Sequence, residues 1–272
     1  RNSIGEERFR REHECEFVIY DETLINSLKL IDMSGIEPIR TMGQVRWYKH
    51  PHPTCTYVIG LDPSTGTGGD AAGIQVIELP TMVQVAEWQH NMTPIEGQMK
   101  VMMDIMQYLT ELQVEQIYWS VENNSIGEAA LLVIRDTGEE SFPGDFLHEP
   151  KKVSGRRARK GFTTGHRTKV EACLSAKRLI EQDKLIINSK PLLSELKNFV
   201  AKGNSFSAKP GEHDDLVMSM MLCIRMIHYI STFEDEVFEA VNSTLANPND
   251  YGDYDREWDD QDDDGPMPLG IL

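Results

Sequence analysis

The sequence has few cysteines, no long apolar run and fewer basic than acidic residues, and each shortage argues against a class of protein. Its four cysteines lie far apart and form no C-x-x-C pair, which argues against a zinc ribbon and a redox motif. No stretch approaches the roughly 18 uninterrupted apolar residues of a membrane span, and the charged residues 6–11 interrupt any signal-peptide core. The G-x-x-x-x-G-K-S/T loop is also missing, so we expect no P-loop ATPase activity.

The net charge of −17 is concentrated at one end of the chain. Residues 231–272 contain 13 acidic residues and one basic residue, whereas the other 230 residues contain 31 acidic and 26 basic ones. Residues 151–178 contain ten basic residues and one acid, Glu171. A run of like charge is often only a solvated surface, but this cation-rich segment also suits a phosphate-bearing partner.

Composition shifts predict three segments. Residues 1–56 are expected to be a lead-in, because mixed charge and several prolines interrupt them. Residues 57–231 are expected to form one α/β domain, and the 40% hydrophobic content of the chain suffices for its core. Residues 232–272 are expected to be an acidic tail. The chain begins at Arg1, and we expect a larger protein upstream of it.

Apolar patterns predict the elements of the α/β domain. Strands are predicted at 57–62, 71–79, 83–89, 116–122 and 185–188. Helices are predicted at 93–109, 125–135, 167–182, 192–200 and 214–229. Three successive strands followed by alternating helices and strands predict a mixed α/β sheet flanked by helices.

Acidic residues stand at the ends of three predicted elements. Asp62 ends the first strand, Glu122 ends the fourth, and Asp214 and Asp215 open the last helix. If the two strands are adjacent, Asp62 and Glu122 meet at their carboxyl ends, where open α/β sheets bind ligands. Clustered carboxylates suit Mg²⁺ or Mn²⁺, and two such ions about 4 Å apart hold the attacking and leaving oxygens of a phosphodiester. The pattern predicts a nuclease site, although each acid alone has an ordinary structural use in a turn or helix cap.

Two assignments within this site stay open. Asp70 closes a glycine-rich turn after Asp62, where it can stabilise the turn or act as an accessory metal ligand. Consecutive helix residues point about 100° apart, so both Asp214 and Asp215 are candidates until the phase of their helix is known. The preceding His213 can position water or a phosphate, or be only a neighbour of the helix cap.

Four motifs follow one another in the chain. They are Val58–Asp62 with the glycine-rich turn to Asp70, Val121–Asn124, Gly161–Thr164 leading into Arg167–Lys169, and Gly211–Ser219. Together they resemble the nuclease domain of the large terminase subunit of tailed bacteriophages, myovirus type, over about residues 55–230. The resemblance implies a ribonuclease H-like fold and an endonuclease that uses Mg²⁺ or Mn²⁺, expected as two ions. Such an enzyme cuts concatemeric viral double-stranded DNA at the start and end of head filling. The family's catalytic, metal-binding acids carry over to Asp62, Glu122 and one or both of Asp214 and Asp215.

The basic segment gains a role from this resemblance. Lysine and arginine beside a carboxylate cleft would neutralise DNA phosphates without reading sequence. The residues predicted to bind DNA are Lys151, Lys152, Arg156, Arg157, Arg159, Lys160, Arg167 and Lys169. The last two stand at a predicted helix start, where backbone amides also attract phosphate.

The resemblance also implies partners and a location. Residues 5–17 are similar to the last stretch of the family's ATPase domain, so we expect that domain upstream in the same chain. The other expected partners are double-stranded DNA, the portal protein and the small terminase subunit, without a membrane. The expected location is the host cell cytoplasm, on the packaging motor of the procapsid. The acidic tail could be a solvating appendage, a contact for a packaging protein, or a DNA mimic over the basic cleft.

Three other interpretations compete with this one. An actin-like or sugar-kinase-like nucleotide-binding fold also places an aspartate before a glycine turn, but it needs a second similar lobe that the sequence lacks. A Holliday-junction resolvase of the same fold and a non-enzymatic DNA-binding module are the others. His50, His52 and Cys55 offer three zinc-type ligands with no fourth nearby, so we predict no zinc site.

Overall fold

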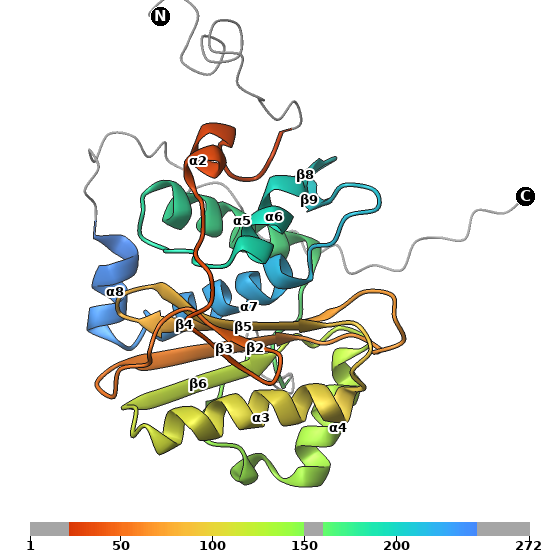
Figure 1. Cartoon of the computed structure of the whole chain (residues 1–272), viewed down its shortest axis with the longest axis vertical. Coiled ribbons are helices and arrows are strands. Elements are labelled where there is room, and N and C mark those ends of the chain that lie inside the picture. The colour runs from red at the N-terminus through yellow and green to blue at the C-terminus, as the bar shows by residue number, and fades with distance from the viewer. Residues whose placement is uncertain (1–21, 150–159, 244–272) are drawn as a thin grey trace, which may run out of the picture. The chain divides into compact units, whose positions relative to one another are not determined.

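The strands form a mixed sheet whose order differs from their order in the chain (Figure 1). The computed structural model describes residues 22–149 and 160–243. The seven strands lie in the order β1-β2-β5-β4-β3-β6-β7. Their bounds are β1 Arg40–Met42, β2 Val45–Trp47, β3 Thr56–Asp62, β4 Ala72–Leu79, β5 Val83–His90, β6 Gln116–Val121 and β7 Asp145–Phe146. β3 pairs antiparallel with β4 and parallel with β6, which confirms the predicted mixed sheet.

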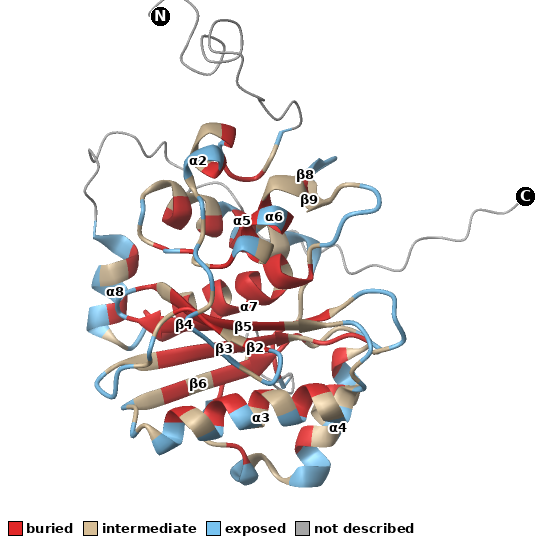
Figure 2. Cartoon of the chain, in the orientation of Figure 1, coloured by how far each residue is buried: buried red, intermediate tan, exposed pale blue. Residues whose placement is uncertain are grey.

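Helices cover both faces of this sheet. α7 (Asp215–Ile230) crosses one face with α5 (His166–Glu181) and α6 (Lys190–Asn198) beyond it, and α3 (Ile95–Glu111) and α4 (Gly127–Thr137) cover the other (Figure 1). The smaller elements are α2 Ser27–Asp32, the 3-10 turn Glu139–Ser141, α8 Asp235–Asn242, and a hairpin of β8 Phe199–Lys202 and β9 Ser205–Ala208. Buried residues therefore gather in two cores, one on each face of the sheet (Figure 2). Within the described ranges no helix combines the length and apolarity that a membrane crossing requires.

The alternation of side chains along β3 and β6 decides which face each residue serves. The core under α3 and α4 receives Tyr57, Ile59 and Leu61 from β3 and Ile117, Trp119 and Val121 from β6. Successive side chains of a strand point to opposite faces, so Asp62 and Glu122 lie on the other face, which α7 covers. Val58, which shares this face with Asp62, packs in the core around α7.

α7 lies unusually close to the sheet because two strand residues lack side chains. A Cβ atom added at Gly60 of β3 would come within 2.9 Å of Cys223 Sγ and 3.0 Å of the Ser219 carbonyl oxygen. One added at Gly73 of β4 would come within 2.7 Å of the Asp215 carbonyl oxygen. Both glycines therefore let the first half of α7 rest directly on β3 and β4.

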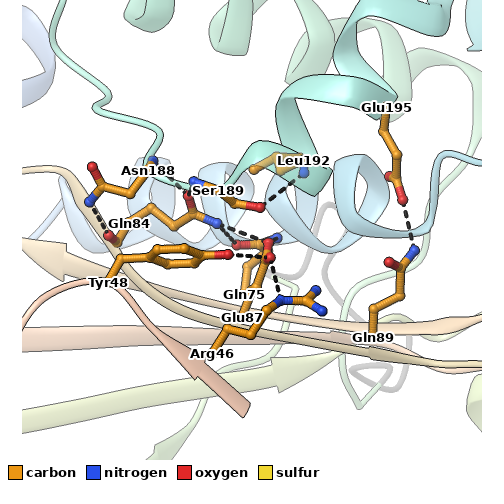
Figure 3. A network of polar contacts seen from close by, with 10 residues as sticks. All are labelled: Arg46, Tyr48, Gln75, Gln84, Glu87, Gln89, Asn188, Ser189, Leu192 and Glu195. Atoms are coloured by element: carbon orange, nitrogen blue, oxygen red, sulfur yellow. Dashed lines mark hydrogen bonds and ion pairs between the residues drawn. The ribbon is translucent and has the colours of Figure 1, made fainter. Parts of the chain in front are cut away.

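The segment 185–188 is not the strand that its apolar pattern predicted. Ile186 makes one isolated bridge with Val83, and Ser189 makes another with Ile36. The backbone N–H groups of Asn188 and Ser189 both donate to the side-chain Oε1 of Gln84, at 2.9 and 2.8 Å (Figure 3). A glutamine side chain thus takes the bonds that a neighbouring strand would otherwise provide.

The other differences concern the ends of elements and of the domain. The helix predicted at 192–200 begins earlier, at Lys190, because Ser189 caps it, and its last residues become β8 instead. Part of the expected lead-in belongs to the sheet, since β2 pairs with β5 and β1 pairs with β2. At the other end, α8 lies in the range assigned to the acidic tail, yet its Val237 and Val241 are buried in the core around α7. The remaining tail lies outside the described residues.

Candidate active site

Asp62 and Glu122 meet at the carboxyl ends of two adjacent parallel strands. β3 and β6 are in register up to Leu61 and Val121, and the Glu122 N–H donates to the Leu61 carbonyl oxygen at 2.9 Å. The two carboxyl groups are close enough to share a hydrogen bond. Glu122 is 6% exposed, and Asn124 Nδ2 donates to its Oε2 at 3.1 Å, which fixes the orientation of that carboxylate.

The start of α7 distinguishes the two neighbouring aspartates. The side chain of Asp215 is 10% exposed and accepts the Ala71 N–H at 3.2 Å, beside the strand β4 that follows the glycine-rich turn. Asp214 is 28% exposed, and its Oδ2 lies 3.3 Å from the N–H of Ala208 and 3.9 Å from Lys169 Nζ. Asp215 therefore faces the sheet, while Asp214 turns toward β9 and α5.

Negative charge accumulates around Asp62. Burial, the hydrogen bond and charge of Glu122, and the charges of Asp215 and Asp214 all raise the pKa of the Asp62 carboxyl well above its usual range. Burial also raises the pKa of Asp215, against the lowering effect of the Ala71 N–H. Groups of like charge that oppose each other's ionisation are typical of a site that a cation completes.

The donor set fits a hard divalent cation. Carboxylate oxygens are the ligands that Mg²⁺ and Mn²⁺ take in proteins, and the group brings oxygen donors from three elements to one end of the sheet. Among residues 22–149 and 160–243, no three His, Cys, Asp or Glu side chains enclose a metal position as they stand. Asp62, Glu122 and Asp215 are the side chains that could hold such an ion.

Asp70 lies at the rim of this acid group. Its side chain is exposed, and its charge raises the pKa of Asp215. His213 Nδ1 lies 3.8 Å from Asp215 Oδ2, with the imidazole 58% exposed. Both residues border the acid group without belonging to its buried part.

The predicted DNA-binding residues separate into two groups. Lys151, Lys152, Arg156, Arg157 and Arg159 lie outside the described residues. The three that the structure describes pair with acids: Lys160 Nζ lies 2.7 Å from Glu139, Arg167 Nε lies 2.8 Å from Glu171, and Lys169 pairs with Asp214. Lys160 and Arg167 are 51% and 77% exposed, so these surface pairs can exchange for phosphate.

The two ends of the basic segment are held together beside Glu122. The Glu149 N–H donates to the Gly161 carbonyl oxygen at 3.0 Å, and Phe162 forms an isolated bridge with Glu122. Arg225 of α7 donates to Glu149 Oε1 at 3.1 Å and lies 5.1 Å from the centre of the Phe162 ring. The residues that flank segment 150–159 on both sides therefore lie next to Glu122.

Three residues of this region were missed by sequence reasoning. Asn124 orients Glu122, Arg225 ties the basic segment to α7, and Glu195 of α6 binds the first turn of α7. Burial raises the pKa of Glu195 to about 7, although the N–H of Val217 opposes the shift. A signal for Glu195 was present, because a glutamate stands in the apolar stripe formed by Leu192 and Leu196.

The weak zinc pattern at 50–55 has other uses in the structure. His52 Nδ1 lies 2.9 Å from Thr54 Oγ1, and the His52 carbonyl oxygen accepts from the hydroxyl of Tyr57 at 3.1 Å. The Tyr57 hydroxyl oxygen also lies 3.0 Å from Glu78 Oε2, so its one proton is shared between the two acceptors. These contacts order the approach to β3.

Comparison with known proteins assigns the family. Residues 59–226, more than half of the chain, match the model of a family described as the terminase RNaseH-like domain. The structure resembles the large terminase nuclease of the thermophilic phage G20c with bound magnesium, with a TM-score of 0.56, 20% identity, and 75% of this chain and 97% of that chain covered. It also resembles the large terminase nuclease domain of Thermus phage P74-26, with a TM-score of 0.52, 20% identity, and coverage of 73% and 94%. The ribonuclease H-like fold is thereby confirmed, and the chain belongs to the terminase RNaseH-like domain family.

Proposed function

We propose that this chain is a divalent-metal-dependent endonuclease that cuts double-stranded viral DNA during genome packaging. The observation that carries the proposal is the meeting of Asp62, Glu122 and Asp215 on one face of a sheet with this family's fold. Nucleases of this family appear with bound magnesium and with bound cobalt among the similar structures, which supports a divalent cation as the cofactor. The resolvase and actin-like interpretations have no comparable support.

Asp62, Glu122 and Asp215 are proposed as the catalytic, metal-binding acids. A bound Mg²⁺ or Mn²⁺ supplies Lewis-acid charge to the phosphate oxygens of the substrate, and two ions are the expected number. The role of the protein is to hold the carboxylates: β3 and β6 place two of them in register, and α7 brings the third to the same face. Asp214 and Asp70 remain candidates for accessory contacts at the rim.

DNA is proposed to approach along the surface where the basic residues gather. Lys160, Arg167 and Lys169 are described, and the two ends of segment 150–159 are tied next to Glu122. Affinity that comes from phosphate neutralisation does not depend on base sequence and falls with salt. The isolated domain is therefore proposed to cut DNA with little sequence preference.

The wider packaging role follows the family. We propose cleavage of concatemeric DNA at the start and end of head filling, with an ATPase domain upstream in the chain. The portal protein and the small terminase subunit are the proposed partners, and the host cell cytoplasm is the proposed location. The myovirus type stays a prediction from the sequence motifs.

The direct test is cleavage of a supercoiled plasmid by the purified chain. Relaxed and linear products are expected with Mg²⁺ or Mn²⁺ and not with EDTA, and the rate should fall steeply as NaCl is added, because released counterions oppose phosphate binding. Cleavage that persists in EDTA would rule out the proposed chemistry. A rate that does not change with salt would rule out the proposed mode of DNA binding.

Metal binding should also make thermal stability depend on pH in a defined direction. The raised pKa of Asp62 means that the folded state holds its proton more tightly than the unfolded state does. This contribution is fully present below the ordinary aspartate pKa and is lost as pH rises through the raised value. Mg²⁺ requires the ionised carboxylates, so the increase in Tm caused by Mg²⁺ should be larger at about pH 8 than at about pH 5. Scanning fluorimetry with and without MgCl₂ measures it, and equal increases at both pH values would contradict the assignment.

A further inference from the structure

The first turn of α7 is held by a side chain from another helix. Glu195 Oε2 accepts the N–H groups of Leu216 and Val217, at 2.8 and 3.0 Å. These are the second and third residues of α7, whose N–H groups have no partner within the helix. Asp214, which occupies the cap position, makes no such bond and turns its carboxylate to Ala208. Glu195 of α6 therefore accepts the N–H groups that the side chain of the cap residue of α7 does not bind.

The second oxygen of Glu195 is anchored to the sheet. Gln89 Nε2 of β5 donates to Glu195 Oε1 at 2.8 Å, and the glutamate is 9% exposed (Figure 3). Through these three hydrogen bonds the carboxylate of Glu195, which belongs to α6, joins β5 to α7. A negative group at this position also interacts favourably with the positive end of the helix dipole.

The helix that carries Glu195 is itself fixed to the sheet by a buried polar network. Ser189 Oγ caps α6 through the Leu192 N–H at 2.9 Å, and Gln84 Oε1 accepts from the backbone just before it. Gln84 Nε2 donates to Gln75 Oε1 at 2.7 Å, and Glu87 accepts from Arg46 and Tyr48 (Figure 3). α6 is therefore attached to β5 near its N-terminal end and again through Glu195.

The position of this contact matters because Asp215 immediately precedes the two amides. A shift of the first turn of α7 would move Asp215 relative to Asp62, which is fixed on β3. The lack of a side chain at Gly73 lets the Asp215 carbonyl oxygen lie close to β4, because a Cβ atom there would come within 2.7 Å of it. The contact with Glu195 sets the remaining freedom of the turn.

We propose that Glu195 is a positioning residue for the metal-binding acid Asp215, acting through the backbone amides of Leu216 and Val217. The inference rests on the proposed nuclease function. Residues that orient metal ligands typically change metal affinity or activity by about 10- to 100-fold when they are removed. An effect of that size on turnover and on the half-saturating Mg²⁺ concentration is expected, with DNA affinity in the absence of metal unchanged.

The test compares two substitutions at one position. Glu195→Leu removes the acceptor and keeps an apolar side chain of similar size, whereas Glu195→Gln keeps one oxygen that can accept both amides. The leucine variant should lose about 10- to 100-fold in turnover and need more Mg²⁺, and the glutamine variant should recover most of both. Amide hydrogen exchange of residues 215–218, measured without metal, should speed up in the leucine variant and stay near wild type in the glutamine variant. Glu195→Ala replaces the leucine variant if that protein does not fold.

Val237→Ala is the matched control. Val237 is buried in the same core but lies on α8, so its truncation lowers Tm without touching Glu195 or the acids. If this variant melts at a temperature as low as that of the leucine variant yet cleaves normally, general destabilisation does not explain the loss. The inference is overturned if the leucine variant keeps wild-type turnover and Mg²⁺ dependence, or if Val237→Ala loses as much activity. Failure of the wild-type chain to cleave DNA would instead overturn the proposed function, and amide exchange would still report on the cap.

Discussion

Replacing Asp62 by asparagine is expected to lower the rate of Mg²⁺-dependent plasmid cleavage by about 1000-fold, because a central carboxylate ligand carries several kcal/mol of transition-state stabilisation. Asp62 lies at the centre of the acid group, because Glu122, Asp215 and Asp214 all raise its pKa. An amide of the same shape keeps the fold and removes the charge. The cleavage rate at saturating Mg²⁺ is the measurement.

The same variant has a second signature in thermal unfolding. The neutral amide relieves repulsion within the acid group, so the metal-free Asp62→Asn protein should melt at the wild-type temperature or above it. Mg²⁺ should then raise its Tm less than it raises that of the wild type. Asp104→Asn is the control, because Asp104 is exposed on α3, pairs only with Lys100 in the described structure and should change neither property. Cleavage by Asp62→Asn at the wild-type rate would remove β3 from the proposed site.

The second large effect separates the two aspartates at the start of α7. Asp215→Asn should lower the cleavage rate by about 100-fold or more, whereas Asp214→Asn should lower it by no more than about tenfold. The reason is burial and direction: Asp215 is the more buried and faces the sheet, whereas Asp214 binds Ala208 and pairs with Lys169. Parallel rate and Mg²⁺ titrations of the two variants measure the difference.

This pair of variants controls for helix stability. The Asp214 side chain makes no capping bond to α7, so Asp214→Asn leaves the start of that helix intact. Similar melting temperatures of the two variants would confirm that the difference in rate is not a folding effect. The opposite order of rates would make Asp214 the third acid, and wild-type rates in both would remove the start of α7 from the site.

That Asp62 and Glu122 would meet if their strands were adjacent could be predicted from sequence, because each acid ends a recognisable strand, whereas the pairing of the two strands is a long-range contact. The period-two alternation of β3 and β6 and their strand-terminal acids place both carboxylates on one face once the strands pair. The phase of α7 could not be predicted in this way. Most of the surface of its first half is apolar, with Leu216, Val217, Met220 and Met221 all in the core, so the apolar pattern there does not show which side faces the sheet.

The phase of α7 is set by residues that lie far from it in the sequence. Gly60 and Gly73 admit the helix at one distance, and Glu195 binds one particular pair of its amides. The strand that was expected at 185–188 failed for a related reason. The N–H of Asn188, at its end, and that of Ser189 are bound by the side chain of Gln84, about a hundred positions earlier, and such a partner cannot be predicted from the local pattern.

The contact of α7 with β3 and β4 over two glycines has a consequence for how the enzyme meets DNA. At Gly60 and Gly73 no strand side chain lies between α7 and the sheet, so there is no deformable layer at these two positions. With Glu195 also holding the first turn, the acid on the helix and the acids on the strands keep one relative position. The backbone positions of the acids are therefore set by the fold itself, before any DNA is bound.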